Sequence, residues 1–103
     1  MPYNGGPMTE AMYYVLLALM HPSHGYGLMN TIEEVSKGRI KMGPGTLYGV
    51  LSRMLKDRLI VLETDDGRRK TYKITKDGKE ALLQEYQRLI SLVEDGNILK
   101  GGI

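Results

Sequence analysis

The sequence predicts a mainly helical fold with one small β-hairpin, and two observations carry that prediction. Apolar residues recur at steps of three and four along four stretches of the 103-residue chain, as they do on the buried face of a helix. Residues 59–64 and 70–75 instead read as two strands around an Asp-Asp-Gly turn, directly after the third helical stretch. A chain of this length has room for one core. We therefore expect a winged helix-turn-helix domain over residues 9–75, with residues 76–95 appended as a dimerisation helix.

The first helix is expected to begin after Thr9, whose hydroxyl suits an N-cap, and to run to about Met20. Pro22 stops it, because proline cannot continue a helix without losing a backbone hydrogen bond. Residues 1–8 are rich in turn-forming residues, so we expect a flexible N-terminal arm there. Residues 96–103 have no readable pattern and are expected to form a flexible tail.

A second helix is expected to open within the Ser-His-Gly-Tyr-Gly segment of residues 23–27 and to end at Gly38. Gly25 and Gly27 each disfavour a helix by roughly 1 kcal/mol relative to alanine. Their presence therefore indicates close packing against a neighbouring segment. The expected buried stripe of this helix is Leu28, Met29, Ile32 and Val35.

The third helix is expected to start at Pro44, whose missing N–H would have no partner in a first turn, after a short extended segment at residues 40–42. Its inward stripe is expected to be Leu47, Val50, Leu51, Met54 and Leu55. The opposite face carries Thr46, Gly49, Ser52, Arg53 and Lys56. Small and polar residues followed by basic ones suit insertion into a DNA groove. An ordinary amphipathic surface helix explains this helix equally well, and the hairpin that follows decides between the two.

The hairpin and the last helix are each marked by their spacing. Tyr72 and Ile74 share one face of their strand, and Thr75 is placed to cap the last helix. The apolar residues of that helix at coiled-coil spacing are Leu82, Tyr86, Leu89 and Val93. The residues that widen its apolar surface are Leu83, Ile90 and Leu92. A helix that is apolar over more than one face needs a partner, and with so small a body we expect a second copy of the chain.

The net charge of +2 conceals an uneven distribution. Between Lys37 and Lys73 ten basic residues stand against four acidic ones, a net charge of +6, whereas the rest of the chain carries −4. Such clustering on one helix and one hairpin is the electrostatic footprint of a protein that binds a polyanion. The expected phosphate contacts are Lys37, Arg39 and Lys41 before the third helix, and Arg68, Arg69 and Lys70 at the hairpin tip.

Several classes of protein are disfavoured by composition. The chain has no cysteine, which excludes disulfides and thiolate metal sites. His21 and His24 are its only histidines, and no spaced pair of carboxylates accompanies them, so we expect no enzyme, metal or cofactor. The longest apolar run, residues 12–20, is too short to span a bilayer and lacks the features of a signal peptide. We therefore expect a cytoplasmic protein with no membrane partner.

Several short segments occur in a fixed order between Thr9 and Val93. They read His24-Gly25-Tyr26-Gly27, Gly45-Thr46-Leu47-Tyr48, Leu51 with Arg53-Met54-Leu55, Leu59-Ile60, and Arg69-Lys70-Thr71-Tyr72 leading to Ile74-Thr75 and Gly78. Each segment alone is a weak signal, but in this order and at this spacing they are specific. The chain resembles the PadR family of winged-helix transcriptional regulators.

The resemblance implies that the third helix and the wing, which is the hairpin after it, read double-stranded DNA. With neighbouring residues of the same surface, the expected DNA-binding set is Lys41, Thr46, Tyr48, Gly49, Ser52, Arg53, Lys56, Arg68, Arg69 and Lys70. The resemblance also implies a homodimeric repressor at its own or a neighbouring promoter. Two such modules related by a dyad would bind an inverted-repeat operator. The expected dimerisation residues are Met12, Leu16, Leu82, Tyr86, Leu89, Ile90 and Val93.

The single short C-terminal helix is similar to a compact subfamily, some of whose members bind flat aromatic drugs between the subunits. A small aromatic effector at the dimer seam is therefore a further hypothesis. The residues that would line its site are Leu16, Met20, Tyr86, Leu89 and Val93. The chain has no tryptophan, so the aromatic clamp of drug-binding relatives is not carried over, and Tyr86 is better interpreted as a side chain of the dimer seam.

Three other positions depart from the family pattern. Gly43 stands where a capping serine is frequent, and Gly49 replaces a bulkier residue. Arg58 replaces the frequent glycine before Leu-Ile, which costs on the order of 1 kcal/mol if the backbone there has a positive φ.

Three alternatives stay open from the residues alone. A winged helix that binds protein instead of DNA would keep the apolar pattern without needing the clustered charge. Thr46 fits a helix cap as well as a DNA contact. The ring of Tyr48 can pack on the second helix while its hydroxyl reaches a phosphate.

Overall fold

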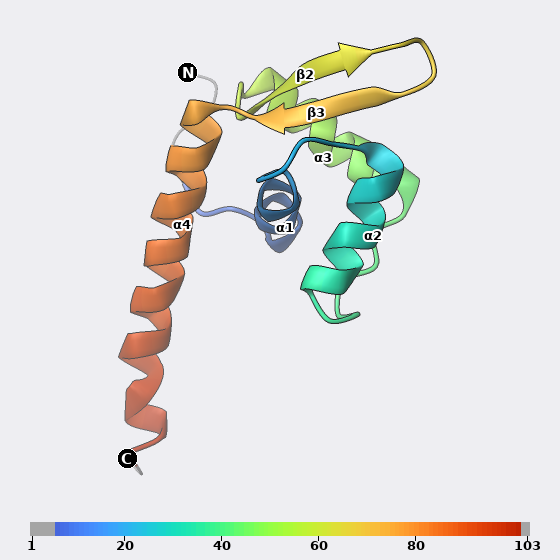
Figure 1. Ribbon diagram of the computed structural model, residues 1–103. Coiled ribbons are helices and arrows are strands. Elements are labelled where there is room, and N and C mark those ends of the chain that lie inside the picture. Colours follow the sequence, from blue (N-terminus) through green and yellow to red (C-terminus); the bar gives the residue numbers. More distant parts are fainter. Residues whose placement is uncertain (1–5, 102–103) are drawn as a thin grey trace.

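The computed structural model describes residues 6–101 of the chain, and its elements follow one another as shown in Figure 1. They are α1 (Glu10–Ala18), β1 (Ser23–His24), α2 (Gly25–Val35), α3 (Pro44–Lys56), β2 (Ile60–Asp65), β3 (Lys70–Ile74), α4 (Lys76–Asp95) and the short 3-10 helix η1 (Gly96–Leu99). The four expected helices and the hairpin are present, and the fold is mainly helical with a small sheet, as the sequence predicted.

The sheet has three strands rather than the expected two. All are antiparallel in the order β1-β3-β2, and the added strand β1 pairs Ser23 with Tyr72 and His24 with Thr71. The register between β2 and β3 shifts after Leu62, which marks a β-bulge in the wing. Because β1 runs directly into α2, the start of α2 is tied to the base of the wing.

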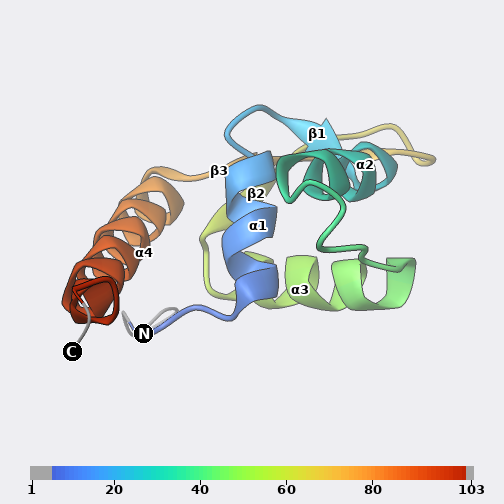
Figure 2. The ribbon, with the colours of Figure 1, turned by 90° about the horizontal axis from the view of Figure 1, so that it is seen from below.

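The core forms around α1, which Figure 2 shows between α2 and α4 with α3 below it. The fully or almost fully buried side chains come from α1, α2, α3 and the start of β2, or from residues next to these elements. They are Val15, Leu16 and Leu19, Leu28 and Ile32, Leu47, Leu51 and Met54, and Leu59 and Ile60. Tyr72 and Ile74 of β3 close the core from the sheet side, with the shared face that the sequence predicted.

The helix α4 belongs to the core only through its first half. Its buried residues are Gly78, Ala81, Leu82 and Glu85. The second half extends away from the domain in Figure 1. The radius of gyration of 15.2 Å exceeds the ~13 Å of a compact chain of this length. The projecting half therefore carries apolar side chains that the single chain leaves uncovered.

A single residue, Thr75, joins β3 to α4. Its backbone N–H donates to the carbonyl of Leu59 at 3.0 Å, and its hydroxyl lies 2.9 Å from the carbonyl oxygen of Arg58. The hydroxyl oxygen also accepts the N–H of Gly78, and this bond makes Thr75 the N-cap of the last helix, as predicted. The joint between the wing and α4 is thus bonded on both sides.

Some details differ from the expectation. Val35 is 49% exposed, because the buried stripe of α2 continues from Ile32 to Ser36 instead. Leu55 is 36% exposed at the edge of the α3 stripe, and residues 40–42 form no strand.

The expected arm and tail are partly ordered. Met8, expected in a flexible arm, packs in the core with 8% exposure, and the first part of the expected tail forms η1. The rest of these two segments, residues 1–5 and 102–103, lies outside the described residues. Within residues 6–101 no helix combines the length and hydrophobicity needed to cross a membrane.

Candidate nucleic-acid interface

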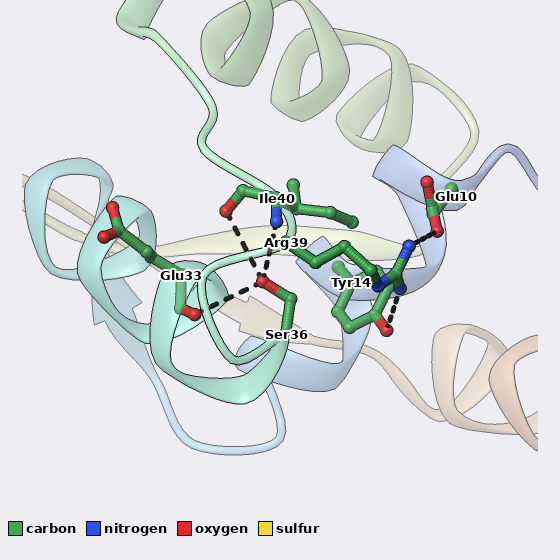
Figure 3. A network of polar contacts seen from close by, with 6 residues as sticks. All are labelled: Glu10, Tyr14, Glu33, Ser36, Arg39 and Ile40. Atoms are coloured by element: carbon green, nitrogen blue, oxygen red, sulfur yellow. Dashed lines mark hydrogen bonds and ion pairs between the residues drawn. The ribbon is translucent and has the colours of Figure 1, made fainter.

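The turn before α3 is held by one buried serine. The hydroxyl of Ser36 donates to the carbonyl of Glu33 at 3.2 Å and accepts the N–H of Ile40 at 2.9 Å (Figure 3). Lys37 and Gly38 lie between them with φ values of 57° and 79°, so the chain reverses through two left-handed residues. This turn fixes the direction in which the chain approaches α3, and it includes the predicted stop at Gly38.

The side chain of Arg39 bonds two residues of α1. Its Nη1 lies 2.6 Å from Oε2 of Glu10, and its Nη2 donates to the hydroxyl of Tyr14 at 2.8 Å (Figure 3). Its guanidinium also lies 5.6 Å from the centre of the Tyr14 ring. The hydrogen bond that Arg39 donates to Glu10 raises the pKa of Arg39 further above its ordinary value. The side chain therefore ties the loop to α1, and the expected phosphate contact of Arg39 stays a prediction.

The helix α3 begins as expected but without a side-chain cap. Pro44 occupies the first turn, and the N-cap is Gly43, which has no side chain to bond the free N–H groups. One face of the helix is exposed along its whole length. Its residues are Thr46, Gly49, Ser52, Arg53 and Lys56. The remaining face is filled by the core residues, so the amphipathic pattern read from the sequence is confirmed.

Tyr48 packs against α2. A methyl group built on Gly25 would meet the hydroxyl of Tyr48 and lie 2.8 Å from its Cζ, so the ring occupies the space that glycine leaves. This explains the glycine at that position, which the sequence predicted as a point of close packing. With 46% of its surface exposed, Tyr48 keeps its outer edge in solvent.

Arg53 is the one α3 cation that has an ion-pair partner in the described part of the chain. Its Nε donates to Oδ2 of Asp57, one turn later, at 3.2 Å. The Arg53 side chain is 71% exposed, whereas that of Asp57 is only 10% exposed. Asp57 was not among the predicted site residues, although its position four residues after Arg53 is the spacing of a helical ion pair.

The tip of the wing is preorganised by two carboxylates. Asp65 accepts the N–H of Gly67 at 2.9 Å, and Asp66 accepts the N–H groups of Arg68 and Arg69 at 3.0 and 2.7 Å. These backbone bonds, the one from Arg69 first, lower the pKa of Asp66 below its ordinary value. The carboxylates thus shape the turn and do not form ion pairs with the side chains beside them.

The cations of the basic segment therefore fall into two groups. Three of the ten, Arg39, Arg53 and Lys73, have a carboxylate within 4.0 Å. The other seven have no ion pair within residues 6–101: they are Lys37, Lys41, Lys56, Arg58, Arg68, Arg69 and Lys70. Their charge is available to an external anion.

The residues expected at a dimer seam lie mostly on the open side of α1 and α4. Tyr86, Ile90 and Val93 are 51%, 38% and 69% exposed, while Met12 and Leu89 are half-buried and Leu82 is buried. Leu16 is different, because it is wholly buried in the core of the single chain. It has no surface to offer a partner or a ligand, so its expected roles in dimerisation and effector binding are corrected.

An apolar groove of about 250 Å³ lies between α1 and α4. Its lining consists of Tyr13, Leu17, Met20, Lys79, Leu82, Leu83 and Tyr86. Two of the five expected effector residues, Met20 and Tyr86, are among them. Leu89 lies instead at a second hollow of about 340 Å³, near the N-terminus of α1. Val93 is exposed further along α4.

The second hollow contains an ion pair with a buried carboxylate, which the sequence did not reveal. Glu85 of α4 is 5% exposed, and its carboxylate accepts hydrogen bonds from Nε and Nη2 of Arg88 at 2.9 and 2.5 Å. The hydrogen bond from Arg88 lowers the pKa of Glu85, with a smaller contribution from the backbone N–H of Met8, while burial acts in the opposite direction. Glu85, through the N–H of Met8, thus links the segment before α1 to α4.

The fold and this basic surface define a winged helix-turn-helix protein of the regulatory class. The family model of the PadR-like transcriptional regulators matches residues 15–84, and the chain belongs to that family. The family consists of transcriptional regulators, which are not enzymes. Within residues 6–101 no cluster of histidine and carboxylate side chains is suited to hold a metal ion.

Three proteins that are similar to this chain give the extent of the likeness. An uncharacterized 37.1 kDa protein in transposon TN4556 of Streptomyces fradiae is 37% identical over 85 residues, which is 82% of this chain and 24% of that protein. The transcriptional regulator YqjI of Escherichia coli is 29% identical over 73 residues, 71% of this chain and 35% of YqjI. The chain thus spans only about a quarter to a third of these relatives. The crystal structure of a PadR family transcriptional regulator from Eggerthella lenta is 27% identical, with a TM-score of 0.71. The match covers 84% of this chain and 74% of the Eggerthella lenta chain.

Proposed function

We propose that this PadR-family regulator binds DNA sequence-specifically, with α3 in the major groove and the wing along the phosphates. The observation that carries the proposal is the placement of the seven cations without ion pairs on α3, the loop before it, the turn after it and the wing tip. Charges left without partners on one surface favour an external polyanion. A solvated surface of ordinary kind would have its charges scattered over the whole molecule.

The side chains of this surface suit different tasks. The basic side chains bind phosphates, the lysines through a single ammonium group and the arginines through two parallel N–H groups. They are Lys41 and Lys56, and Arg68, Arg69 and Lys70 of the wing. Thr46 and Ser52 are hydroxyl donors for phosphates or base edges, and Gly49 leaves space for close approach. Tyr48 offers its exposed hydroxyl edge, and Arg53 has the guanidinium geometry that reads guanine.

The proposed active form is a homodimer that pairs through α4 and the open side of α1. What supports it is the projecting half of α4, where Tyr86, Ile90 and Val93 stay exposed on a helix that the single chain does not cover. Contiguous apolar surface of this kind marks an interaction site. A dyad between two chains places two α3 helices about 34 Å apart, one turn of DNA, and so selects an inverted repeat.

Binding across a promoter makes the dimer a repressor, and the apolar groove gives it a place for an effector. The groove of about 250 Å³ between α1 and α4 adjoins the proposed dimer face, so a flat aromatic molecule there changes how the two chains meet. Titration of the operator complex with a planar aromatic dye tests this part, with dye fluorescence and release of labelled DNA as readouts. Binding without release, or no binding, would reject the effector role and leave DNA binding standing.

The test of DNA binding is fluorescence anisotropy with the promoter region and with random duplex DNA over a salt series. Each phosphate contact contributes about −0.9 to the slope of log K against log salt concentration. Charge reversal at Arg68 and Lys70 is expected to weaken binding to both duplexes and to make the slope less steep by about 2. The matched control is Lys100→Glu, the same change beyond α4. Weak binding of the wild type, insensitive to salt, would instead favour a winged helix that docks on protein.

The test of the dimer is sedimentation equilibrium. Val93→Glu places a charge on an exposed side chain, so the fold of the single chain is expected to survive while the dimer dissociates. The control is Gln87→Glu, another exposed position of α4. If the wild type is monomeric at concentrations where it binds the operator, the dimer proposal is wrong.

A further inference from the structure

Asp57 is a buried acidic residue at the end of the proposed recognition helix. It is the C-cap of α3, and only 8% of its surface is exposed. The free carbonyl groups at a helix C-terminus carry partial negative charge, so the helix itself opposes a carboxylate there. A buried charge in such a place needs a specific partner.

That partner is Arg53, and the pair is strongly asymmetric. The bond from Arg53 Nε to Asp57 Oδ2 is the one hydrogen bond of this carboxylate within residues 6–101. The acidic end is held inside the protein, whereas the Arg53 side chain is 71% exposed. It emerges on the same face of α3 as Ser52 and Lys56.

The bond leaves the useful part of the guanidinium group available. Arginine has five N–H groups, and only the one on Nε is used here. Both terminal nitrogens can therefore form the two-pronged donor that fits O6 and N7 of guanine. An arginine that is already anchored loses less conformational freedom when it binds. We infer that Asp57 is a positioning residue that directs Arg53 at one guanine of the operator, an inference that rests on the proposed function.

The experiment starts from a duplex selected from a random library by the wild-type protein. Dissociation constants are then measured for Asp57→Ala, Asp57→Asn, Arg53→Ala and the double alanine variant. The DNA probes are the selected duplex, versions with each guanine pair replaced in turn, and a random duplex. Thermal melting by circular dichroism checks that each variant is folded.

Asp57→Ala is expected to weaken binding to the selected duplex by about 5- to 10-fold and to the random duplex by less than about 2-fold. The lost discrimination falls on the same guanine as in Arg53→Ala, and the double variant shows no further loss, because the two residues act as a unit. Asp57→Asn keeps an oxygen acceptor, so its loss lies between wild type and Asp57→Ala.

Other outcomes overturn the inference. Equal losses on both duplexes, or a loss that persists in the Arg53→Ala background, mean that Asp57 acts on the stability of α3. A gain in affinity means that the carboxylate holds Arg53 away from DNA. If Asp57→Ala fails to fold, Asp57→Asn decides by its guanine-specific loss or the absence of one. A wild type that selects no sequence refutes the proposed function itself, whereas selection with Arg53→Ala unimpaired refutes only this inference.

Discussion

The joint between the wing and α4 is packed so closely that one methyl group should disrupt it. A Cβ added at Gly78 would meet the carbonyl oxygen of Leu59 and would lie 2.8 Å from Cγ1 of Ile74. The Leu59 carbonyl cannot retreat freely, because it accepts the N–H of Thr75 at 3.0 Å. Overpacking of this kind costs about 1–3 kcal/mol, against a gain of about 1 kcal/mol from the better helix propensity of alanine. Gly78→Ala is therefore expected to lower the free energy of unfolding by up to about 2 kcal/mol.

The matched control is the glycine in the middle of α3. A Cβ at Gly49 has nothing within 4 Å, so Gly49→Ala is expected to stabilise the protein by up to about 1 kcal/mol through helix propensity alone. Thermal melting by circular dichroism, at one protein concentration, should show Tm lowered by up to about 10 °C for Gly78→Ala and raised by up to about 4 °C for Gly49→Ala. If both variants shift in the same direction, propensity rather than packing governs these positions, and the reasoning about the joint is refuted.

Three further predictions concern single side chains. Arg58 has a φ of 61°, so Arg58→Gly is expected to raise the free energy of unfolding by about 0.5–1 kcal/mol in urea titrations, and a loss would show that the arginine makes a stabilising contact. The pKa of Glu85 is lowered in the folded state, so its pairing with Arg88 stabilises the protein above the ordinary pKa of 4.5 and is lost as pH falls through that value toward the lowered one. Between pH 7 and pH 3 the free energy of unfolding should fall less steeply for Glu85→Gln than for the wild type, and parallel curves would contradict this. Glu10→Ala frees Arg39 from its carboxylate, and we expect weaker operator binding in anisotropy because the loop loses its tie to α1; tighter binding would mean that Arg39 contacts phosphate after all.

The features that the sequence predicted best are those whose partners lie within one helical turn. The hydroxyl of Thr9 accepts the N–H of Met12 at 3.1 Å, and Thr75 accepts the N–H of Gly78 in the same way. Pro44 sits in the first turn of its helix, and Gly38 has the positive φ of a helix stop. Local rules suffice for such features, because neither a cap nor a stop depends on where distant segments pack.

The features that it missed depend on distant partners. The strand β1 has two residues, too few to show alternation, and exists because Tyr72 and Thr71 lie beside it. Arg39 reads as one more cation of a basic segment, and only the packing of the loop against α1 turns it toward Glu10. Leu16 lies on a helix that is apolar on several sides, so periodicity alone does not tell which side faces the core.

The single bonded residue between β3 and α4 makes these two elements behave as one lever. Because the amide and the hydroxyl of Thr75 are both tied to carbonyl groups in the turn between α3 and β2, a rotation of the wing is expected to carry α4 with it. In the proposed dimer, the angle at which two α4 helices cross would then set the distance between two wings. A molecule that altered that angle by a few degrees would move both wings out of step with the turn of the double helix, without touching the DNA.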